Sequence, residues 1–355
     1  MKHPIVFADL HHEDLYNSLY FLFEKRLGGT LLRPTGMDWF NQGYWRIAEL
    51  YNNAPDTIGQ FLELRGIKEY PFIPPFRDTP LNAIKEETRD YYLIDLPPFD
   101  HKAVTVEQFK NADIDYVIAS HPLHFDSFAI MINKLKPTAK LICQFGNTWN
   151  INDYPYKNVM ASLAPQPVPG GTNAVFYHQE FDTNIFCYKP PVYNKKVKAF
   201  LHVFDSYPDA PLFYEVEKMM PEWKFEAHGA TSRDDNVTGH QNIADAMHDS
   251  MFIWHLKRGG DGYGHIIHNA FACGRPPIVK LEYYQGQLAG QLMIDGETCL
   301  STDGLSSGQI VNKILDYSQP EKYEKLSKQA YEIFTRVVDF AKEEIMIKDF
   351  LEKIK

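Results

Sequence analysis

Two cations stand directly before a glycine-rich stretch near residue 260. Lys257 and Arg258 are followed by Gly259-Gly260-Asp261-Gly262-Tyr263-Gly264. Glycines let a backbone approach a ligand closely, because they lack a Cβ and tolerate positive φ angles. Two neighbouring positive charges and one carboxylate complete a set suited to an anionic ligand. We therefore expect this stretch to bind a phosphate-bearing molecule.

The elements around this stretch support the same interpretation. Residues 251–255 form an apolar run typical of a buried strand, and residues 265–273 favour a helix that stops at Gly274. A second apolar run, around Ile278 and Val279, predicts the next strand. The glycine-rich stretch would then lead into a helix N-terminus, whose free N–H groups attract anions.

A composite motif extends over residues 261–298. Asp261-Gly262-Tyr263-Gly264 is followed by Asn269-Ala270-Phe271-Ala272-Cys273-Gly274-Arg275-Pro276, and later by Asp295-Gly296-Glu297-Thr298. This pattern resembles the signature of nucleotide-sugar glycosyltransferases with the GT-B fold, in particular families 4 and 1. That signature has E-G-F-G, a second Glu, A-x-A-x-G-x-P and then D-G-x-T-G. Two departures stand out, since Asp261 replaces the first Glu and the neutral Asn269 replaces the second.

The resemblance implies a metal-independent transferase that uses a nucleoside-diphosphate sugar, with a UDP-sugar as the favoured donor. Lys257 and Arg258 would neutralise the diphosphate, Asp261 would hold sugar hydroxyls and Asn269 the ribose. The similarity to the group with two glutamates favours retention of the anomeric configuration. The residues expected to bind the donor are Ser206, Lys257, Arg258, Gly260, Gly262, Tyr263, Gly264, His265 and Asn269. For Ser206, a plain helix cap is an equally good interpretation.

The first half of the chain opens with a strand over residues 4–8, a helix over 15–27 and a strand over 30–34. Asp9 and His11 follow the first strand, where parallel sheets place ligands, and are candidates for catalysis. A helix-capping cluster over residues 9–14 is an equally good interpretation. A further strand over 114–120 leads to His121, the best match to the family histidine that reaches the donor sugar.

Alternation of strands and helices predicts an α/β protein of the GT-B type, with two Rossmann-like doubly wound domains facing a cleft. At 355 residues, two domains of similar size are expected. We assign 1–185 to an acceptor-side domain, 186–340 to the nucleotide-sugar domain and 341–355 to a helix that crosses back. Residues 165–171 (Pro-Gln-Pro-Val-Pro-Gly-Gly) have the composition of an interdomain linker, and residues 188–191 (Tyr-Lys-Pro-Pro) are a second linker-like stretch.

The amino-acid composition favours a folded protein without a membrane-spanning segment. The chain has 44% hydrophobic and 23% charged residues, as folded domains do. It contains no apolar run long enough to span a membrane, and its start does not resemble a signal peptide. The four cysteines have no metal-binding spacing, which favours reduced, buried thiols. A cytoplasmic protein is expected, in the host cytoplasm if its source is a virus.

The acceptor is left open by the sequence. The first half resembles glycosyltransferase-like proteins of phages, which makes a hydroxymethylated pyrimidine in DNA one candidate acceptor. The net charge of −10 disfavours a surface that coats nucleic acid broadly, so a cell-surface or small-molecule acceptor is the other candidate. The neutral Asn269 also allows a non-catalytic nucleotide-sugar or glycan-binding relative. A sugar-nucleotide 2-epimerase shares the fold and is a third alternative.

Overall fold

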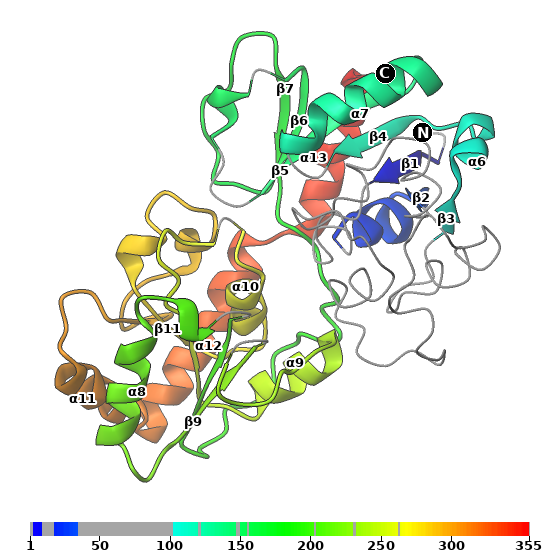
Figure 1. The fold of residues 1–355 in the computed structure, drawn as a ribbon. Helices are drawn as coiled ribbons and strands as arrows, with labels where there is room; N and C mark the ends of the chain where they lie inside the picture. Colours follow the sequence, from blue (N-terminus) through cyan, green and yellow to red (C-terminus); the bar gives the residue numbers. More distant parts are fainter. Residues whose placement is uncertain are drawn as a thin grey trace, which may run out of the picture.

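The computed structural model contains two lobes, each built around a parallel sheet (Figure 1). It describes residues 3–8, 18–34, 102–119, 122–146, 150–154, 156–201, 204–229, 232–261 and 263–354. All structural statements below concern these residues.

The first sheet has seven strands in the order β3-β2-β1-β4-β5-β6-β7, and every neighbouring pair is parallel. The chain runs outward from β1 to β3 and returns to the other side of β1 with β4. The strands are β1 Ile5–Ala8, β2 Thr30–Pro34, β3 Lys102–Val104, β4 Tyr116–Ala119, β5 Lys140–Phe145, β6 Asn158–Ala161 and β7 Asn173–Phe176.

Helices pack against both faces of this sheet because its strands are apolar on both sides. Phe7 packs with α6 (Val106–Asn111) and α7 (Pro122–Leu135) on one face. Its neighbours Val6 and Ala8 point the other way, toward the π-helical turn η1 (Phe21–Arg26) and α13 (Phe340–Lys353). Thr105 begins α6 with a capping box, in which its side chain accepts a hydrogen bond from the Gln108 N–H.

The second sheet has five parallel strands in the order β12-β11-β10-β8-β9. They are β8 Lys196–Phe200, β9 Lys224–His228, β10 Phe252–Trp254, β11 Pro277–Val279 and β12 Leu300–Ser301. On one face lie α8 (Ala210–Met219) and α11 (Ser307–Tyr317). On the other lie α9 (His240–His248) and α10 (His265–Ala272). The sheet is therefore doubly wound.

The last two helices connect the lobes. The helix α12 (Pro320–Val337) packs against the second sheet, and α13 belongs to the core of the first. The Tyr116 hydroxyl of β4 donates a hydrogen bond of 3.1 Å to the Leu351 carbonyl of α13. Asp339 separates the two helices and caps α13, accepting a hydrogen bond from the Lys342 N–H. The C-terminal helix thus crosses back to the first lobe, as expected for the fold class.

The predicted α/β architecture with two parallel sheets is confirmed. The interpretation of residues 165–171 as an interdomain linker is wrong, because this segment joins β6 and β7 within the first sheet. Proline and glycine suit any long loop, so composition could not distinguish a loop within a sheet from a linker. The short strands β3, β6 and β7 were not expected from the sequence.

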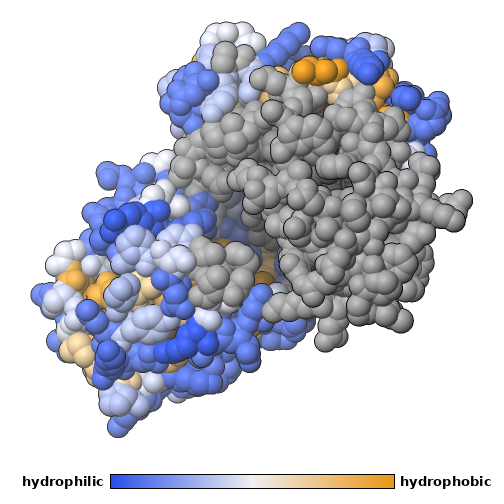
Figure 2. Space-filling view, in the orientation of Figure 1, coloured by the Kyte–Doolittle hydropathy of each residue, from blue (hydrophilic) through white to orange (hydrophobic). Residues whose placement is uncertain are grey.

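The visible surface of the second lobe is mainly hydrophilic, with apolar residues in small separate patches (Figure 2). Among the described helices, none has both the length and the apolar composition needed to cross a membrane. The four cysteines are all free thiols; Cys143, Cys273 and Cys299 are buried and Cys187 is partly so.

Candidate functional site

The glycine-rich stretch forms the loop between β10 and α10, and we call it the 257–264 loop. In the second sheet the chain leaves β8 toward β9 and then crosses to β10 on the other side of β8. Doubly wound sheets commonly bind their ligands at the carboxyl ends of the two strands that flank such a change in strand order. The 257–264 loop follows β10 and the turn η5 (Phe204–Ser206) follows β8. Both loops therefore lie at the position where this topology places a ligand.

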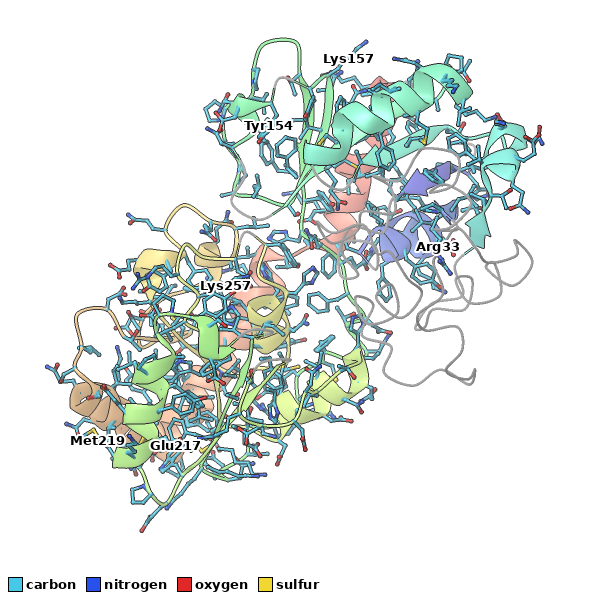
Figure 3. All side chains as sticks on the ribbon, viewed as in Figure 1. Arg33, Tyr154, Lys157, Glu217, Met219 and Lys257 are labelled. Atoms are coloured by element: carbon cyan, nitrogen blue, oxygen red, sulfur yellow. The ribbon has the colours of Figure 1, made fainter. Side chains whose placement is uncertain are left out.

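Figure 3 shows where this loop lies within the second lobe. Lys257 is at the end of the lobe nearer to the first lobe, whereas Glu217 and Met219 of α8 are at the far end.

Asp261 is the centre of the charged contacts in this loop. Its side chain is 15% exposed and forms an ion pair through Oδ1 with the Lys257 ammonium. His255, a buried residue directly after β10, places Nε2 at 3.3 Å from Oδ2 of the same carboxylate. The two carboxylate oxygens thus face two different basic side chains.

These contacts decide the charge of Asp261. Burial by itself would raise its pKa, but the contact with His255 and the charge of Lys257 together outweigh that cost and lower the pKa to about 2. The same carboxylate raises the pKa of Lys257 in spite of the burial of the ammonium. At neutral pH the site therefore contains an ionised carboxylate beside a charged lysine.

The backbone of the loop depends on glycine and on one glutamine. Gly259, Gly260 and Gly264 have φ angles of 81°, 74° and 75°, in the region that L-residues rarely adopt. Gln287, from the segment after β11, donates to the Gly259 carbonyl at 2.8 Å and accepts from the Asp261 N–H at 3.0 Å. A Cβ on Gly260 would collide with the Gln287 side chain. Gln287, which is not part of the loop, thus fixes the loop backbone through these two hydrogen bonds.

Three further predicted residues lie in α10 or directly before it: Tyr263 precedes the helix, His265 is its first residue and Asn269 belongs to its second turn. Tyr263 is buried, with its ring stacked on His268 at a centroid distance of 4.0 Å. His265 contacts the Gln179 side chain, which belongs to the segment after β7 of the first sheet. Asn269 is buried, and its Oδ1 has no hydrogen-bond partner among the described residues. Gly264 caps the helix without a side chain, so no side-chain group covers the helix N-terminus from that position.

Ser206 and Arg258 lie at the outer edge of this region, and both are exposed. A hydrogen bond with Tyr283 raises the pKa of Arg258. The Tyr283 hydroxyl in turn donates a 2.8 Å hydrogen bond to Asp209, three residues beyond Ser206. The loops after β8, β10 and β11 are thereby brought together at one edge of the sheet.

The other predicted site residues lie outside the described residues. These are Asp9, His11, His121 and Gly262. The described ends of β1 and β4 show where these candidates leave the sheet. Ala8 pairs with Ile118, and β1 and β4 are the two parallel strands at which the strand order changes from one side of β1 to the other. The candidates Asp9 and His121 follow these two neighbouring strands in the sequence. Their catalytic roles remain predictions.

The downstream aspartate of the motif has a different environment. Asp295 accepts hydrogen bonds from the Lys313 ammonium at 2.7 and 2.8 Å and from the Ser301 N–H at 2.7 Å. Lys313 belongs to α11, and Ser301 ends β12. Asp295 thus joins the edge strand to a helix.

Two residues in direct contact with Asp261 were absent from the sequence-based site. A signal existed for His255, because a polar residue at the carboxyl end of a buried parallel strand lies where such sheets bind ligands. No local signal existed for Gln287, whose contact with Asp261 joins segments 26 residues apart in the chain.

The first lobe contacts this region through the segment after β7. His178 places Nδ1 at 2.5 Å from Glu343 of α13, and its ring lies 5.6 Å from that of His268 in α10. Gln179 contacts His265 and also donates to Ser162 at 2.5 Å. A polar network therefore connects the start of α10 to both the first sheet and the crossing helix. Within the described residues, no group of three or more His, Cys, Asp or Glu side chains has metal-binding geometry.

Comparisons with known proteins identify the fold. No protein-family model matches the chain, and no curated protein matches it by sequence. Solved structures do match over nearly the full length. A structure of HepE from Anabaena in complex with UDP and glucose superposes with a TM-score of 0.58 at 13% identity, covering 99% of each chain.

Two other structures agree with this match. A glycosyltransferase from Rickettsia africae ESF-5 gives a TM-score of 0.58 at 11% identity, covering 100% of this chain and 99% of that one. An alpha-glucosyltransferase in complex with UDP-glucose and DNA containing an abasic site gives 0.57 at 9% identity, covering 98% of each chain. Together with the two doubly wound sheets and the crossing helix, these full-length matches give this chain the GT-B fold.

Proposed function

We propose that this protein is a glycosyltransferase that takes a sugar from a nucleoside diphosphate, with a UDP-sugar as donor. The observation that carries the proposal is the ionised Asp261 beside Lys257. Both lie in a glycine-rich loop at the topological switch point of the second sheet, between β8 and β10. Structures of similar fold hold UDP with glucose, or UDP-glucose with DNA.

In this proposal the positive groups of the 257–264 loop bind the diphosphate. Lys257 and the exposed Arg258 face the leaving group, and the uncapped N-terminus of α10 adds free N–H groups. Charge that grows on the departing diphosphate is stabilised by such fixed donors, which is where a transferase gains much of its rate. Gly260, Gly262 and Gly264 allow the phosphates to approach the backbone, and Ser206 contributes its hydroxyl from the loop after β8.

The carboxylate and the buried amide would bind the sugar and the ribose. Asp261 is ionised at neutral pH and accepts hydrogen bonds from sugar hydroxyls. Asn269 has a free Oδ1 among the described residues, so it can accept a hydrogen bond from a ribose hydroxyl. The rings of Tyr263 and His265 pack against each other at the start of α10, with Tyr263 buried. His121, His11 and Asp9 are proposed to act from the first lobe on the donor sugar and the acceptor.

We propose residues 1–185 as the acceptor domain, 186–340 as the donor domain and 341–355 as the returning helix. The proposed reaction needs no metal, because Lys257, Arg258 and the start of α10 supply the positive charge at the diphosphate. Transfer with retention of configuration follows from the resemblance to families that use two acidic residues. A hydroxymethylated base in DNA and a small-molecule or cell-surface acceptor are the two acceptor classes, and the reaction takes place in the cytoplasm.

A second candidate function is binding of a nucleotide-sugar without transfer. Two observations favour it. Asn269 is neutral where the resembling family has an acid, and Lys257 is already paired with Asp261 inside the protein. A protein of this kind would bind the donor and release no nucleotide from it.

The decisive experiment is a donor screen. The protein is incubated with a panel of sugar-labelled nucleotide donors, with and without EDTA, and nucleotide release and sugar transfer are followed. Acceptor arms contain DNA with hydroxymethylated pyrimidines, the same DNA unmodified, and simple sugars. We expect release from one UDP-sugar, with Asp261→Ala lowering the rate about 100-fold.

The outcomes separate the candidates. Donor binding in calorimetry without turnover on any acceptor identifies the binding protein. Interconversion of the sugar without acceptor identifies an epimerase. Failure to bind any nucleotide or nucleotide-sugar sinks the proposal altogether.

A further inference from the structure

Each carboxylate oxygen of Asp261 contacts a different basic residue, and these two residues differ in how deeply their side chains are buried. Oδ1 contacts the Lys257 ammonium and Oδ2 lies 3.3 Å from His255 Nε2. The Asp261 backbone is held separately, since its N–H donates to Gln287. The carboxylate could therefore lose one of its two basic partners and still keep its position.

The two partners differ in how freely they can move. His255 is fully buried directly after β10, and its backbone N–H donates a 2.9 Å hydrogen bond to Ile278 of β11. The side chain of Lys257 is 29% exposed, and it extends on four rotatable bonds from the outer part of the loop. The lysine is thus the partner that can turn toward a ligand, and the histidine is the one that stays.

His255 also has spare capacity for this task. Both ring nitrogens are buried and neither makes a hydrogen bond among the described residues, so the link to Asp261 is the 3.3 Å ion-pair contact of Nε2 with Oδ2. Its remaining ring neighbour is Tyr284, at a centroid distance of 6.3 Å. Asp261 is the charged side chain that lies within ion-pair distance of the imidazole.

We propose that His255 is a positioning residue that holds Asp261 through Oδ2 while the Lys257 ammonium passes from Asp261 to a phosphate of the donor. This inference rests on the proposed function, because it assumes a diphosphate ligand at the 257–264 loop. No covalent bond changes; one ion pair is exchanged for another. Asp261 is then both a site residue and an internal competitor of the diphosphate.

Such a competitor predicts effects of unusual sign. Removing the carboxylate frees Lys257, so an anion without a sugar binds more tightly to the variant than to the wild type. Removing the His255 contact leaves Asp261 dependent on Lys257 alone, so the same anion binds more weakly. Removing both must again favour the anion, because no carboxylate is left to compete for the lysine.

The test is calorimetric titration with inorganic pyrophosphate and, in parallel, with UDP. Asp261→Asn is expected to strengthen pyrophosphate binding about fivefold, as the loss of one partly exposed competing ion pair implies. Lys257→Gln should weaken it and remove the effect of Asp261→Asn in the double variant. Asp295→Asn is the matched control, because its lysine partner is Lys313, and it should leave binding unchanged.

A pair of substitutions at residue 255 isolates the histidine. The Gln amide nitrogen reaches the place of His Nε2, whereas the Asn amide stops at the place of Nδ1. His255→Gln should bind pyrophosphate as the wild type does, and His255→Asn should bind it about threefold more weakly. The double variant His255→Asn/Asp261→Asn should bind at least as tightly as the wild type, a recovery that simple damage to the fold would not produce.

Each outcome supports or overturns the inference. Weaker pyrophosphate binding by Asp261→Asn overturns the exchange, and a defect of His255→Asn that persists in the double variant overturns the role of His255. If the wild-type protein transfers sugar and Asp261→Asn binds pyrophosphate with unchanged affinity, the inference is wrong and the proposed function stands. The expected pyrophosphate pattern with no binding of UDP or any nucleotide-sugar supports the exchange and sinks the proposed function.

Discussion

Asp261 and Asp295 are both followed by glycine, both pair with a lysine, and both belong to the second lobe, yet their surroundings differ. Asp261 lies at the central reversal point of the sheet with a 15% exposed side chain, and it contacts Lys257 and the buried His255. Asp295 is 43% exposed at the edge strand, where Lys313 and the Ser301 N–H occupy its oxygens.

The difference lies in what each ion pair joins. Lys313 also donates to the Ser301 carbonyl at 3.0 Å, so the Asp295 pair ties β12 to α11 and has a structural use. The Lys257 pair is local to one loop, spanning four residues, and joins no distant elements. An ion pair that holds no elements together, at the edge where the fold binds ligands, is available for exchange with a ligand. Sequence motifs alone treat the two aspartates alike.

Truncating the two lysines should separate these uses most strongly. Lys257→Ala is expected to lower kcat/KM for the donor about 100-fold, because it removes charge stabilisation at the diphosphate. It should also lower the free energy of unfolding by about 1–2 kcal/mol, because the buried Asp261 loses one of its two basic partners. Lys313→Ala should leave kcat/KM within about threefold and lower the free energy of unfolding by about 1–2 kcal/mol, through loss of charged hydrogen bonds. Steady-state kinetics and urea unfolding of both variants check this. Equal losses of kcat/KM in the two variants would contradict the comparison.

Acid should affect the Asp261 contact in a defined range. Its pKa is lowered from 3.8 to about 2, so the ionised carboxylate stabilises the folded state above pH 4, and this contribution is lost as the pH falls toward 2. The free energy of unfolding of the wild type should exceed that of Asp261→Asn by about 2 kcal/mol near pH 6. The gap should close toward pH 2. A gap that does not vary between pH 6 and pH 2 would show that the carboxylate is not held by its basic neighbours.

Two adjacent glycines test the geometry of the loop on a finer scale. Both have positive φ, but a Cβ on Gly260 meets Gln287, whereas one on Gly259 has no atom within 4 Å. Gly259→Ala should cost about 1 kcal/mol of stability, the cost of the backbone conformation. Gly260→Ala should add the displacement of Gln287 from the Asp261 N–H and lower transfer about tenfold, against less than threefold for Gly259→Ala. Similar kinetics for the two variants would mean that Gln287 does not hold the site.

Much of the fold could be predicted from local patterns. Short apolar runs predicted β1, β2, β4 and β10, each of which is a strand in the structure. Gly274, at φ 64°, follows the end of α10. The strands β6 and β7 were missed because four residues with mixed polarity carry little periodicity, and a proline-rich loop separates them.

The candidate site was predictable only where its residues are consecutive. The 257–264 stretch and Asn269 could be found because glycine spacing and charge lie within one segment. Gln287 could not, since it reaches the loop from 26 residues away, and neither could the contact between Gln179 and His265, 86 residues apart. Asp9, His11 and His121 lie outside the described residues and stay predictions.

The sequence by itself determined that a strand, a glycine-rich turn with two cations and a helix follow one another, because backbone freedom and apolar periodicity are local properties. Only the tertiary structure decided that β8 and β10 are neighbours, that His255 and Lys257 divide the oxygens of Asp261, and that Asp295 is tied to α11 instead. Strand order and burial depend on the whole core. They determine how strongly a carboxylate interacts with the charges around it, and so whether it links two elements of the fold or can bind a ligand.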